Sequence, residues 1–118
     1  MFQALFGNRQ TKENPVKQMT VAELKTLIDQ GTPPLLVDVR SVQEYEKDGH
    51  IAGTRLLPLP ALNQRRDELP KDQAIVCICR SGNRSQVAAE QLQAHGYGDV
   101  ANLVGGMRQW RSAGYPVA

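Results

Sequence analysis

The sequence predicts an α/β domain built on a mostly parallel, doubly wound sheet. Segments with the pattern of strands alternate along the chain with segments with the pattern of helices, which is the order of repeated βαβ units. The strand segments are continuously apolar, as expected for strands that helices cover on both faces. The chain has 118 residues, of which 41% are hydrophobic. We therefore expect a single domain over residues 17–118, after a flexible N-terminal arm over residues 1–16.

The first predicted helix covers MTVAELKTLIDQG, residues 19–31. Thr20 and Glu23 form a capping-box pattern at its start, the apolar residues fall on one helical face, and Gly31 is expected to end it. The apolar run PPLLVDV, residues 33–39, comes next. Its short length and its prolines predict a short strand.

The middle of the chain predicts two helices and one strand. Ser41 and Glu44 repeat the capping pattern in RSVQEYEKDG, residues 40–49, which predicts a second short helix. The stretch HIAGTRLLPLP then contains a short strand, over roughly 54–57, before its prolines. The segment ALNQRRDEL, residues 61–69, predicts a weak helix.

The last part of the chain carries the strongest patterns. The segment AIVCIC, residues 74–79, is the most apolar predicted strand, and SQVAAEQLQAHG, residues 85–96, predicts an amphipathic helix closed by Gly96. The segment VANLVGG, residues 100–106, predicts the last strand, and MRQWRSAG, residues 107–114, predicts the final helix.

The composition argues against several classes of protein. The chain has 14 Lys and Arg residues against 12 Asp and Glu residues, and its net charge is +2. This charge is too small to favour nucleic acid or a membrane surface as a partner. No apolar stretch approaches the roughly 20 residues of a membrane span, and the N-terminus lacks the pattern of a signal peptide. We therefore expect a cytoplasmic protein that binds neither nucleic acid nor membrane.

The chain has two cysteines, Cys77 and Cys79. A disulfide between two residues so close in one strand would be strained, so both thiols are expected to be free, which fits a reducing compartment. Together with His50 and His95 they do not form a metal-binding spacing, and we expect neither a metal nor a cofactor. Cys77 is interpreted as a buried core residue.

The stretch CRSGNRS, residues 79–85, begins at the end of the most apolar strand. In an open parallel sheet, ligands bind beyond the carboxyl ends of the strands. The next helix, which is expected to start near Arg84 or Ser85, offers unpaired backbone N–H groups at that place. Gly82 permits the tight curl that turns these groups inward. The pattern predicts an anion-binding loop with Cys79 as its nucleophile.

The surroundings expected for Cys79 favour nucleophilic chemistry. N–H donors, a helix N-terminus and two arginines are expected to lower the pKa of its thiol, which makes the thiolate a nucleophile at neutral pH. Arg80 and Arg84 can hold an oxyanion by bidentate hydrogen bonds. At least one of them is expected to order the loop or a carboxylate instead. Ser85 fits a helix N-cap better than a catalytic hydroxyl.

Two polar residues outside the loop are interpreted as structural residues near the site. Asp38 ends its predicted strand and is expected to anchor a loop or to pair with Arg40. His50 lies in a predicted turn between a helix and a strand. A structural hydrogen bond from its ring is favoured over a role as general base.

Three blocks of the sequence resemble the single-domain rhodaneses, the thiosulfate sulfurtransferase family, from Met19 to Val117. The block LLVDVRSVQEYEKDGHIAGTRLLPL is similar to the Asp-Val-Arg, Glu-Tyr and Gly-His-Ile-x-Gly pattern of that family. CRSGNRS is similar to its active loop, and NLVGGMRQWRSAGYPV is similar to its closing Gly-Gly, Trp and Gly-x-Pro. Three such blocks in the right order make the resemblance specific.

The resemblance implies a rhodanese-like, five-stranded parallel sheet with helices on both faces, and a sulfurtransferase. Cys79 would take a sulfane sulfur from thiosulfate or from a persulfide donor and would pass it, in a ping-pong reaction, to cyanide or to a thiol such as thioredoxin or glutathione. Arg40 and Glu44 would form a structural ion pair. The loop that binds the substrate and cradles the persulfide would consist of Arg80, Ser81, Gly82, Asn83, Arg84 and Ser85.

Two other functions stay open at this point. The fold also hosts phosphatases and arsenate reductases, so the fold alone does not decide the reaction. Cysteine phosphatases place five residues between Cys and Arg, whereas four separate Cys79 from Arg84, and Ser85 stands where their Arg would be. The shorter ring suits a single sulfur atom. The third class is a noncatalytic rhodanese module for partner binding, although such modules typically lack the active cysteine.

Overall fold

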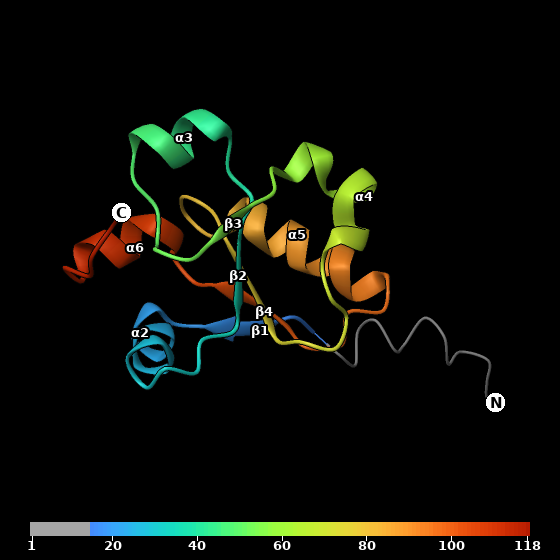
Figure 1. Cartoon of the computed structure of the whole chain (residues 1–118), viewed down its shortest axis with the longest axis horizontal. Helices are drawn as coiled ribbons and strands as arrows, with labels where there is room; N and C mark the ends of the chain where they lie inside the picture. Colours follow the sequence, from blue (N-terminus) through green and yellow to red (C-terminus); the bar gives the residue numbers. More distant parts are fainter. Residues whose placement is uncertain (1–14) are drawn as a thin grey trace.

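Five parallel strands form the central sheet, in the order β1-β5-β4-β2-β3 (Figure 1). The computed structural model describes residues 15–118. The strands are β1 (Lys17–Met19), β2 (Leu35–Asp38), β3 (Arg55–Leu56), β4 (Ile75–Ile78) and β5 (Val100–Leu103). The predicted α/β class and the parallel, five-stranded sheet are confirmed. The expectation of a flexible arm concerns mostly residues 1–14, which lie outside the described residues.

Helices cover both faces of this sheet. Figure 1 shows α2 and α6 on one side of the sheet, α4 and α5 on the other, and α3 beyond the end of β2. The helices are α2 (Val21–Asp29), α3 (Val42–Lys47), α4 (Leu62–Arg65), α5 (Asn83–Ala94) and α6 (Gly106–Ser112), and the 3₁₀ turns η1 (Leu59–Ala61) and η2 (Arg66–Glu68) flank α4. Among these described helices, none has the length and apolar character needed to cross a membrane.

Two apolar cores result from this layering. One lies between the sheet and α5 and includes Cys77, Ala88 and Leu92. The other lies between the sheet and the pair α2 and α6, and includes Leu24 and Trp110. A strand with a helix on each face must be apolar on both sides, which is why β4 is a continuous apolar run and β5 is apolar except for Asn102.

Local sequence signals account for the starts of α2 and α3. The side chain of Thr20 accepts a hydrogen bond from the N–H of Glu23, and the Glu23 carboxylate accepts one from the N–H of Thr20. Ser41 and Glu44 make the same reciprocal pair at the start of α3. Both predicted capping boxes are therefore present.

The structure differs from the sequence pattern in two places. The strand β1 was not expected from the pattern, because its three residues, KQM, form no apolar run. Pairing with β5 holds this edge strand in place. The weak helix expected over residues 61–69 is divided into α4 and η2, since Arg65, with φ of −113° and ψ of 2°, departs from regular helical geometry.

The order of the strands fixes where a ligand can bind. The chain passes from β2 outward to β3, crosses back to β4, and then runs outward in the other direction to β5. The connections that leave β2 and β4 therefore diverge above the boundary between these two neighbouring strands. Open parallel sheets bind ligands at such a switch point, beyond the carboxyl ends of the strands.

Candidate active site

Cys79 lies immediately after β4, in the short loop that leads into α5. The helix α5 begins at Asn83, and its N-cap is Gly82, whose φ of 103° is in the left-handed region that favours glycine. A Cβ at this position would also lie 3.2 Å from the backbone nitrogen of Gly105. The sharp turn brings the first N–H groups of α5 back toward the sulfur of Cys79. The prediction that the helix starts near residue 84 or 85 is off by one or two positions.

The sulfur of Cys79 is surrounded by hydrogen-bond donors. The N–H of Gly82 lies 3.1 Å from Sγ, and the hydroxyl of Ser85 lies 3.2 Å from it. Burial opposes ionisation of the thiol, but hydrogen bonds from the Ser85 hydroxyl and from the N–H groups of Ser85, Gly82 and Ser81 outweigh it and lower the pKa of Cys79. The loop therefore favours a thiolate at Cys79.

Cys77 lies two residues earlier in β4 and is fully buried. Its burial, together with the nearby charge of Cys79, raises the pKa of the Cys77 thiol to about 12. Both cysteines are free. The two thiols thus have opposite character, and only Cys79 has the low pKa that nucleophilic chemistry requires.

The N-terminus of α6 holds the other side of the loop. The N–H groups of Met107 and Arg108 donate to the carbonyl oxygens of Cys79 and Arg80, at 2.9 and 3.0 Å. A Cβ on Gly106 would collide with the carbonyl oxygen of Cys79, so glycine is required for this close approach. Because α6 binds the loop carbonyls, the loop N–H groups stay directed toward the sulfur.

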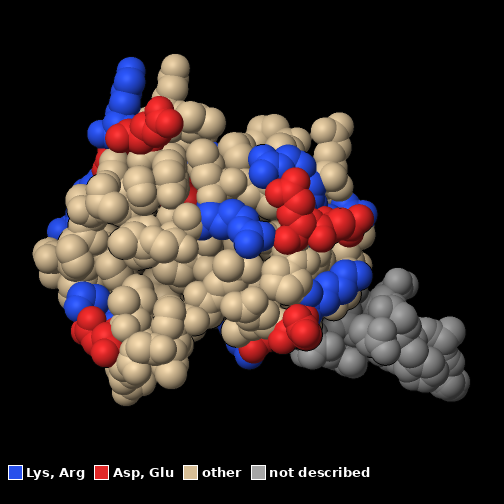
Figure 2. Space-filling model, viewed as in Figure 1, with Lys and Arg blue, Asp and Glu red and all other residues tan. Residues whose placement is uncertain are grey.

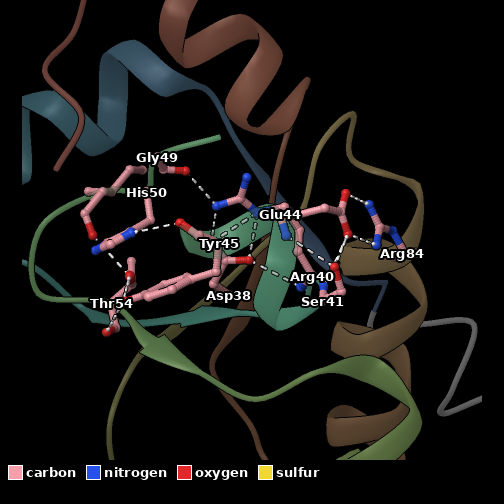
Figure 3. A network of polar contacts seen from close by, with 10 residues as sticks. Asp38, Arg40, Ser41, Glu44, Tyr45, Gly49, His50, Thr54 and Arg84 are labelled. Carbon is pink, nitrogen blue, oxygen red and sulfur yellow. Dashed lines mark hydrogen bonds and ion pairs between the residues drawn. The ribbon is translucent and has the colours of Figure 1, made fainter. Parts of the chain in front are cut away.

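The two arginines of the loop have different roles. The guanidinium of Arg84 makes a two-point ion pair with Glu44, with distances of 2.7 and 2.8 Å (Figure 3). The hydrogen bonds from Arg84 lower the pKa of Glu44 to about 2. Burial acts in the opposite direction, and hydrogen bonds from Ser41 lower this pKa further. Arg80 is exposed, and among residues 15–118 it has no ion-pair partner. One arginine orders a carboxylate, as predicted, and that arginine is Arg84.

The predicted ion pair between Arg40 and Glu44 is wrong. Arg40 pairs with Asp38, its neighbour two residues earlier, through Nε and Nη2 at 2.9 and 2.8 Å, and it also donates to the carbonyl oxygen of Gly49 (Figure 3). Both charged side chains are almost completely buried. They fix the turn that follows β2, which agrees with the structural role predicted for Asp38.

His50 is a structural residue in this geometry. Its Nδ1 donates to the carbonyl oxygen of Tyr45 at 3.0 Å, and its ring stacks on the Tyr45 ring with centroids 3.7 Å apart. Figure 3 shows both rings on the far side of Arg40 from Arg84. These contacts join His50 to Tyr45 of α3 and agree with the interpretation of His50 as a hydrogen-bonding residue.

The interpretation of Ser85 as an N-cap is wrong. Ser85 is the third residue of α5, is fully buried, and directs its hydroxyl at Cys79 Sγ and at Asn102 Oδ1. Sequence reasoning also missed Asn102, whose signal was a polar residue inside the apolar strand β5. Ser81 and Asn83 are exposed at the surface of the loop.

Neither a metal nor a large cavity defines this site. Within residues 15–118, no group of three or more His, Cys, Asp or Glu side chains could hold a metal ion. A groove of about 760 Å³ lies between β1, α2 and the residues that precede β4, and it includes none of the loop residues. We therefore assign the site from the chemistry of the loop and not from the size of a cavity.

The parallel sheet, together with a cysteine of lowered pKa in the loop between β4 and α5, defines the class of this α/β domain. The chain belongs to the rhodanese-like domain family, whose model matches residues 20–113. A putative sulfur carrier protein of Bacillus subtilis, YrkF, is 35% identical over 106 residues, covering 88% of this chain and 57% of that protein. This chain thus spans little more than half of that relative.

Two further proteins show the range of descriptions among similar chains. A sulfurtransferase of Allochromatium vinosum is 42% identical over 83 residues, covering 70% of this chain and 77% of that protein. A solved structure from Rhodopseudomonas palustris, of a protein of unknown function described as a possible tyrosine phosphatase, aligns with a TM-score of 0.80 at 26% identity. That alignment covers 100% of this chain and 99% of the other.

Proposed function

We propose that this protein is a sulfurtransferase that carries a sulfane sulfur as a persulfide on Cys79. One observation carries the proposal: the thiol of Cys79 has a lowered pKa because the N–H groups of its loop and the Ser85 hydroxyl donate hydrogen bonds to its sulfur. Similar proteins are described as a sulfurtransferase and a putative sulfur carrier, which supports the same reaction class.

The first half-reaction is attack of the Cys79 thiolate on a sulfane sulfur. With thiosulfate as donor, a new S–S bond forms between Cys79 Sγ and the outer sulfur of thiosulfate, while the sulfur–sulfur bond of thiosulfate breaks and sulfite leaves with its electron pair. The total charge is conserved, since Sγ becomes neutral, sulfite gains one negative charge, and the outer sulfur keeps the negative charge that it carried in thiosulfate. Sulfite is a good leaving group, so this step needs no general acid. The inward N–H groups of the loop then stabilise the persulfide charge.

The second half-reaction returns Cys79 to its thiolate. A thiophilic acceptor attacks the outer sulfur, forms a bond to it, and displaces the Cys79 thiolate. The donor and acceptor therefore react in turn, which is ping-pong kinetics. We propose thiosulfate or a persulfide as donors, and cyanide or a thiol such as thioredoxin or glutathione as acceptors. Free thiols suit the cytoplasm as the proposed compartment.

One face of the protein shows how its charged side chains are distributed. On the face shown in Figure 2, basic and acidic side chains are interspersed and form no broad patch of one sign. That face offers no extended footprint for a polyanion. Arg80, which is exposed at the rim of the loop, is the proposed binding residue for an anionic donor.

The second candidate function is a phosphatase, because one structural neighbour is described as a possible tyrosine phosphatase. Two features favour sulfur transfer over it. Only four residues separate Cys79 from Arg84, and the guanidinium of Arg84 is already held by Glu44. A phosphate group would need a wider ring and an unpaired arginine within it.

Intact-mass measurement tests the proposal. Wild-type protein incubated with thiosulfate should gain one sulfur atom, and cyanide should remove it and release thiocyanate. Cys79→Ser should gain none, whereas Cys77→Ser should still gain it, although its free energy of unfolding falls by about 2 kcal/mol because a hydroxyl replaces a buried thiol. No adduct together with phosphate release would favour a phosphatase, and neither activity would indicate a binding module.

A further inference from the structure

The hydroxyl of Ser85 has two neighbours but only one proton. Its oxygen lies 3.2 Å from Cys79 Sγ and 2.5 Å from Asn102 Oδ1. All three groups are buried, so water cannot replace a missing partner. The Ser85 hydroxyl can donate to only one of these two neighbours at a time. The neighbour that does not accept its proton must itself donate a hydrogen bond to the Ser85 oxygen.

The contact with Asn102 continues as a chain of amides to the surface. Asn102 Nδ2 donates to Gln18 Oε1 at 3.0 Å, and Gln18 Nε2 donates to Gln86 Oε1 at 2.8 Å. The chain ends where Gln86 Nε2 donates to the Glu90 carboxylate at 3.0 Å. Every amide donor in this arrangement points away from the sulfur. This direction suits a neutral thiol, whose proton is donated to the Ser85 oxygen while Ser85 donates to Asn102.

A thiolate at Cys79 demands the opposite direction. An anionic sulfur accepts the Ser85 proton, since a charged acceptor forms the stronger hydrogen bond. The 2.5 Å contact between the oxygens of Ser85 and Asn102 then contains no proton. Rotation of the Asn102 amide by half a turn removes this repulsion, because its Nδ2 then donates to the Ser85 oxygen. Gln18 is exposed, and can turn in water to donate to Asn102 in its place.

We propose that Asn102 is a positioning residue whose amide, backed by Gln18, directs the Ser85 proton toward the Cys79 sulfur when that sulfur is anionic and away from it when it is neutral. No proton passes between residues in this process. The Ser85 O–H and the amides of Asn102 and Gln18 rotate, and the thiol proton itself is released to water.

This inference rests on the proposed function for its role in turnover. During sulfur transfer Cys79 Sγ alternates between an anionic thiolate and the neutral inner sulfur of a persulfide, whose outer sulfur carries the charge. A fixed donor would suit only one of these two states. A hydroxyl whose direction follows the charge stabilises the thiolate without holding back the step that consumes it.

The effect of Asn102 on the pKa of Cys79 can be separated from the effects of the charged groups near Cys79. Arg84 interacts with the Cys79 charge but is held by Glu44, and Cys77 stays neutral because its pKa is about 12. Asp38, opposite the end of β4, is paired with Arg40. Glu90 lies at the surface end of the amide chain. None of these groups contacts the Ser85 hydroxyl, so changes at Asn102 can be followed through Ser85 alone.

The test is a double-mutant cycle that measures the pH dependence of alkylation of Cys79 by iodoacetamide, followed by intact mass. Asn102→Asp replaces the amide by a group that only accepts, so it holds the Ser85 proton away from the sulfur. We expect a rise of about one unit in the pKa of Cys79, which is about a tenfold loss of thiolate at neutral pH. In a Ser85→Ala background the same change should have about a threefold effect or less, which is the through-space effect of the charge.

A second variant tests the proposal even if Asn102→Asp does not fold. Gln18→Glu is an exposed, acceptor-only substitution that keeps Asn102 Nδ2 directed outward, and it should raise the pKa of Cys79 in the same direction by a smaller amount. Its control is Gln86→Glu, one hydrogen bond farther from Cys79 in the chain of amides. This control should raise the pKa of Cys79 by a still smaller amount. Shifts that are equal with and without the Ser85 hydroxyl, or no shift in the folded variants, would overturn the proposal. Alkylation does not require sulfur transfer, so a failure of the proposed function is seen separately in the mass assay.

Discussion

Glu44 and Arg84, 40 residues apart in the sequence, form a two-point ion pair that joins the start of α3 to the start of α5 (Figure 3). The pair spans the switch point of the sheet, because α3 follows β2 and α5 follows β4. It also uses a carboxylate that already caps α3 through Ser41. One side chain therefore orders the start of α3 and fixes the guanidinium of Arg84, which is why Arg80 is the proposed binding residue for the substrate.

Glu44→Gln tests this link through its dependence on pH. Gln preserves the capping box but removes the charge, so we expect a loss of about 1 kcal/mol of unfolding free energy at pH 7, after allowance for the partial exposure of Arg84. The pKa of Glu44 is lowered from 4.5 to about 2 in the folded protein. The extra stability of the wild type is therefore fully present above pH 4.5 and disappears as the pH falls toward 2.

Urea unfolding of both proteins at several pH values measures this difference. The matched control is Glu68→Gln, which removes the exposed ion pair with Arg65 and should have a smaller effect, since exposed pairs are screened by solvent. A Glu44→Gln protein whose deficit is the same at pH 7 and at pH 2.5 would contradict the role of the charge.

Ser85→Ala removes the side-chain hydrogen bond that does most to lower the pKa of Cys79. We expect that pKa to rise, so that alkylation of Cys79 at pH 7 slows by about threefold to tenfold. The two proteins should react at equal rates once the pH exceeds both pKa values, because both are then fully thiolate. Ser85→Thr retains a hydroxyl and should stay close to wild type. Equal pH profiles for wild type and Ser85→Ala would show that the backbone N–H groups alone set the pKa.

Gly106→Ala should disrupt the loop although it changes none of the loop residues. A Cβ at this position would collide with the backbone of Cys79 and Arg80, and the φ of 54° is strained for any side chain. We expect a loss of about 3 kcal/mol of unfolding free energy and loss of the low pKa of Cys79. Gly114→Ala is the matched control, since its φ of 78° is also positive but nothing lies within 4 Å of the added Cβ.

Gly114→Ala should then lose only about 1 kcal/mol from the backbone strain, and its Cys79 should react as in the wild type. Thermal unfolding and iodoacetamide alkylation measure the two effects. Similar losses of thiol reactivity in both variants would mean that α6 acts on the loop through general stability and not through the contact of Gly106.

The sequence allowed the layers of the fold and the lowered pKa of Cys79 to be predicted, because both depend on local patterns. Apolar runs located β4 and β5, and Ser-x-x-Glu located the start of α3. The partners of these elements could not be predicted in the same way. Glu44 pairs with Arg84 and not with Arg40, since Asp38 lies closer to Arg40 once β2 ends. Pairing across the sheet depends on which loops meet at the switch point, and a local pattern does not contain that information.

The same limit explains the errors at Ser85 and β1. A serine near the expected start of a helix matches an N-cap, but the left-handed turn at Gly82 starts α5 earlier and carries Ser85 to the buried side, beside Cys79. The residues of β1 have no strand pattern, and Gln18 holds its place by pairing with Asn102 of β5. Both features arise from tertiary contacts that override local preference.

Arg80→Ala tests which arginine meets the substrate. Arg80 is exposed beside the loop, its carbonyl is fixed by the N–H of Arg108, and Arg84 is occupied by Glu44. We expect the KM for thiosulfate to rise about tenfold at low ionic strength with kcat nearly unchanged, since a charge-assisted contact with the bound anion is lost. Arg80→Lys should restore part of the affinity, because it keeps the charge but not the planar fork of donors.

Steady-state assays at two salt concentrations, with Arg111→Ala as an exposed control on the last turn of α6, separate this role from a general effect of surface charge. Added salt should raise the KM for thiosulfate more in the wild type than in Arg80→Ala. The salt screens an electrostatic attraction to the anion that the variant has already lost. Arg111→Ala should keep the wild-type KM. If Arg80→Ala also kept it, the donor anion would be bound by the loop N–H groups alone, and the positive charge at the rim would have no part in choosing the substrate.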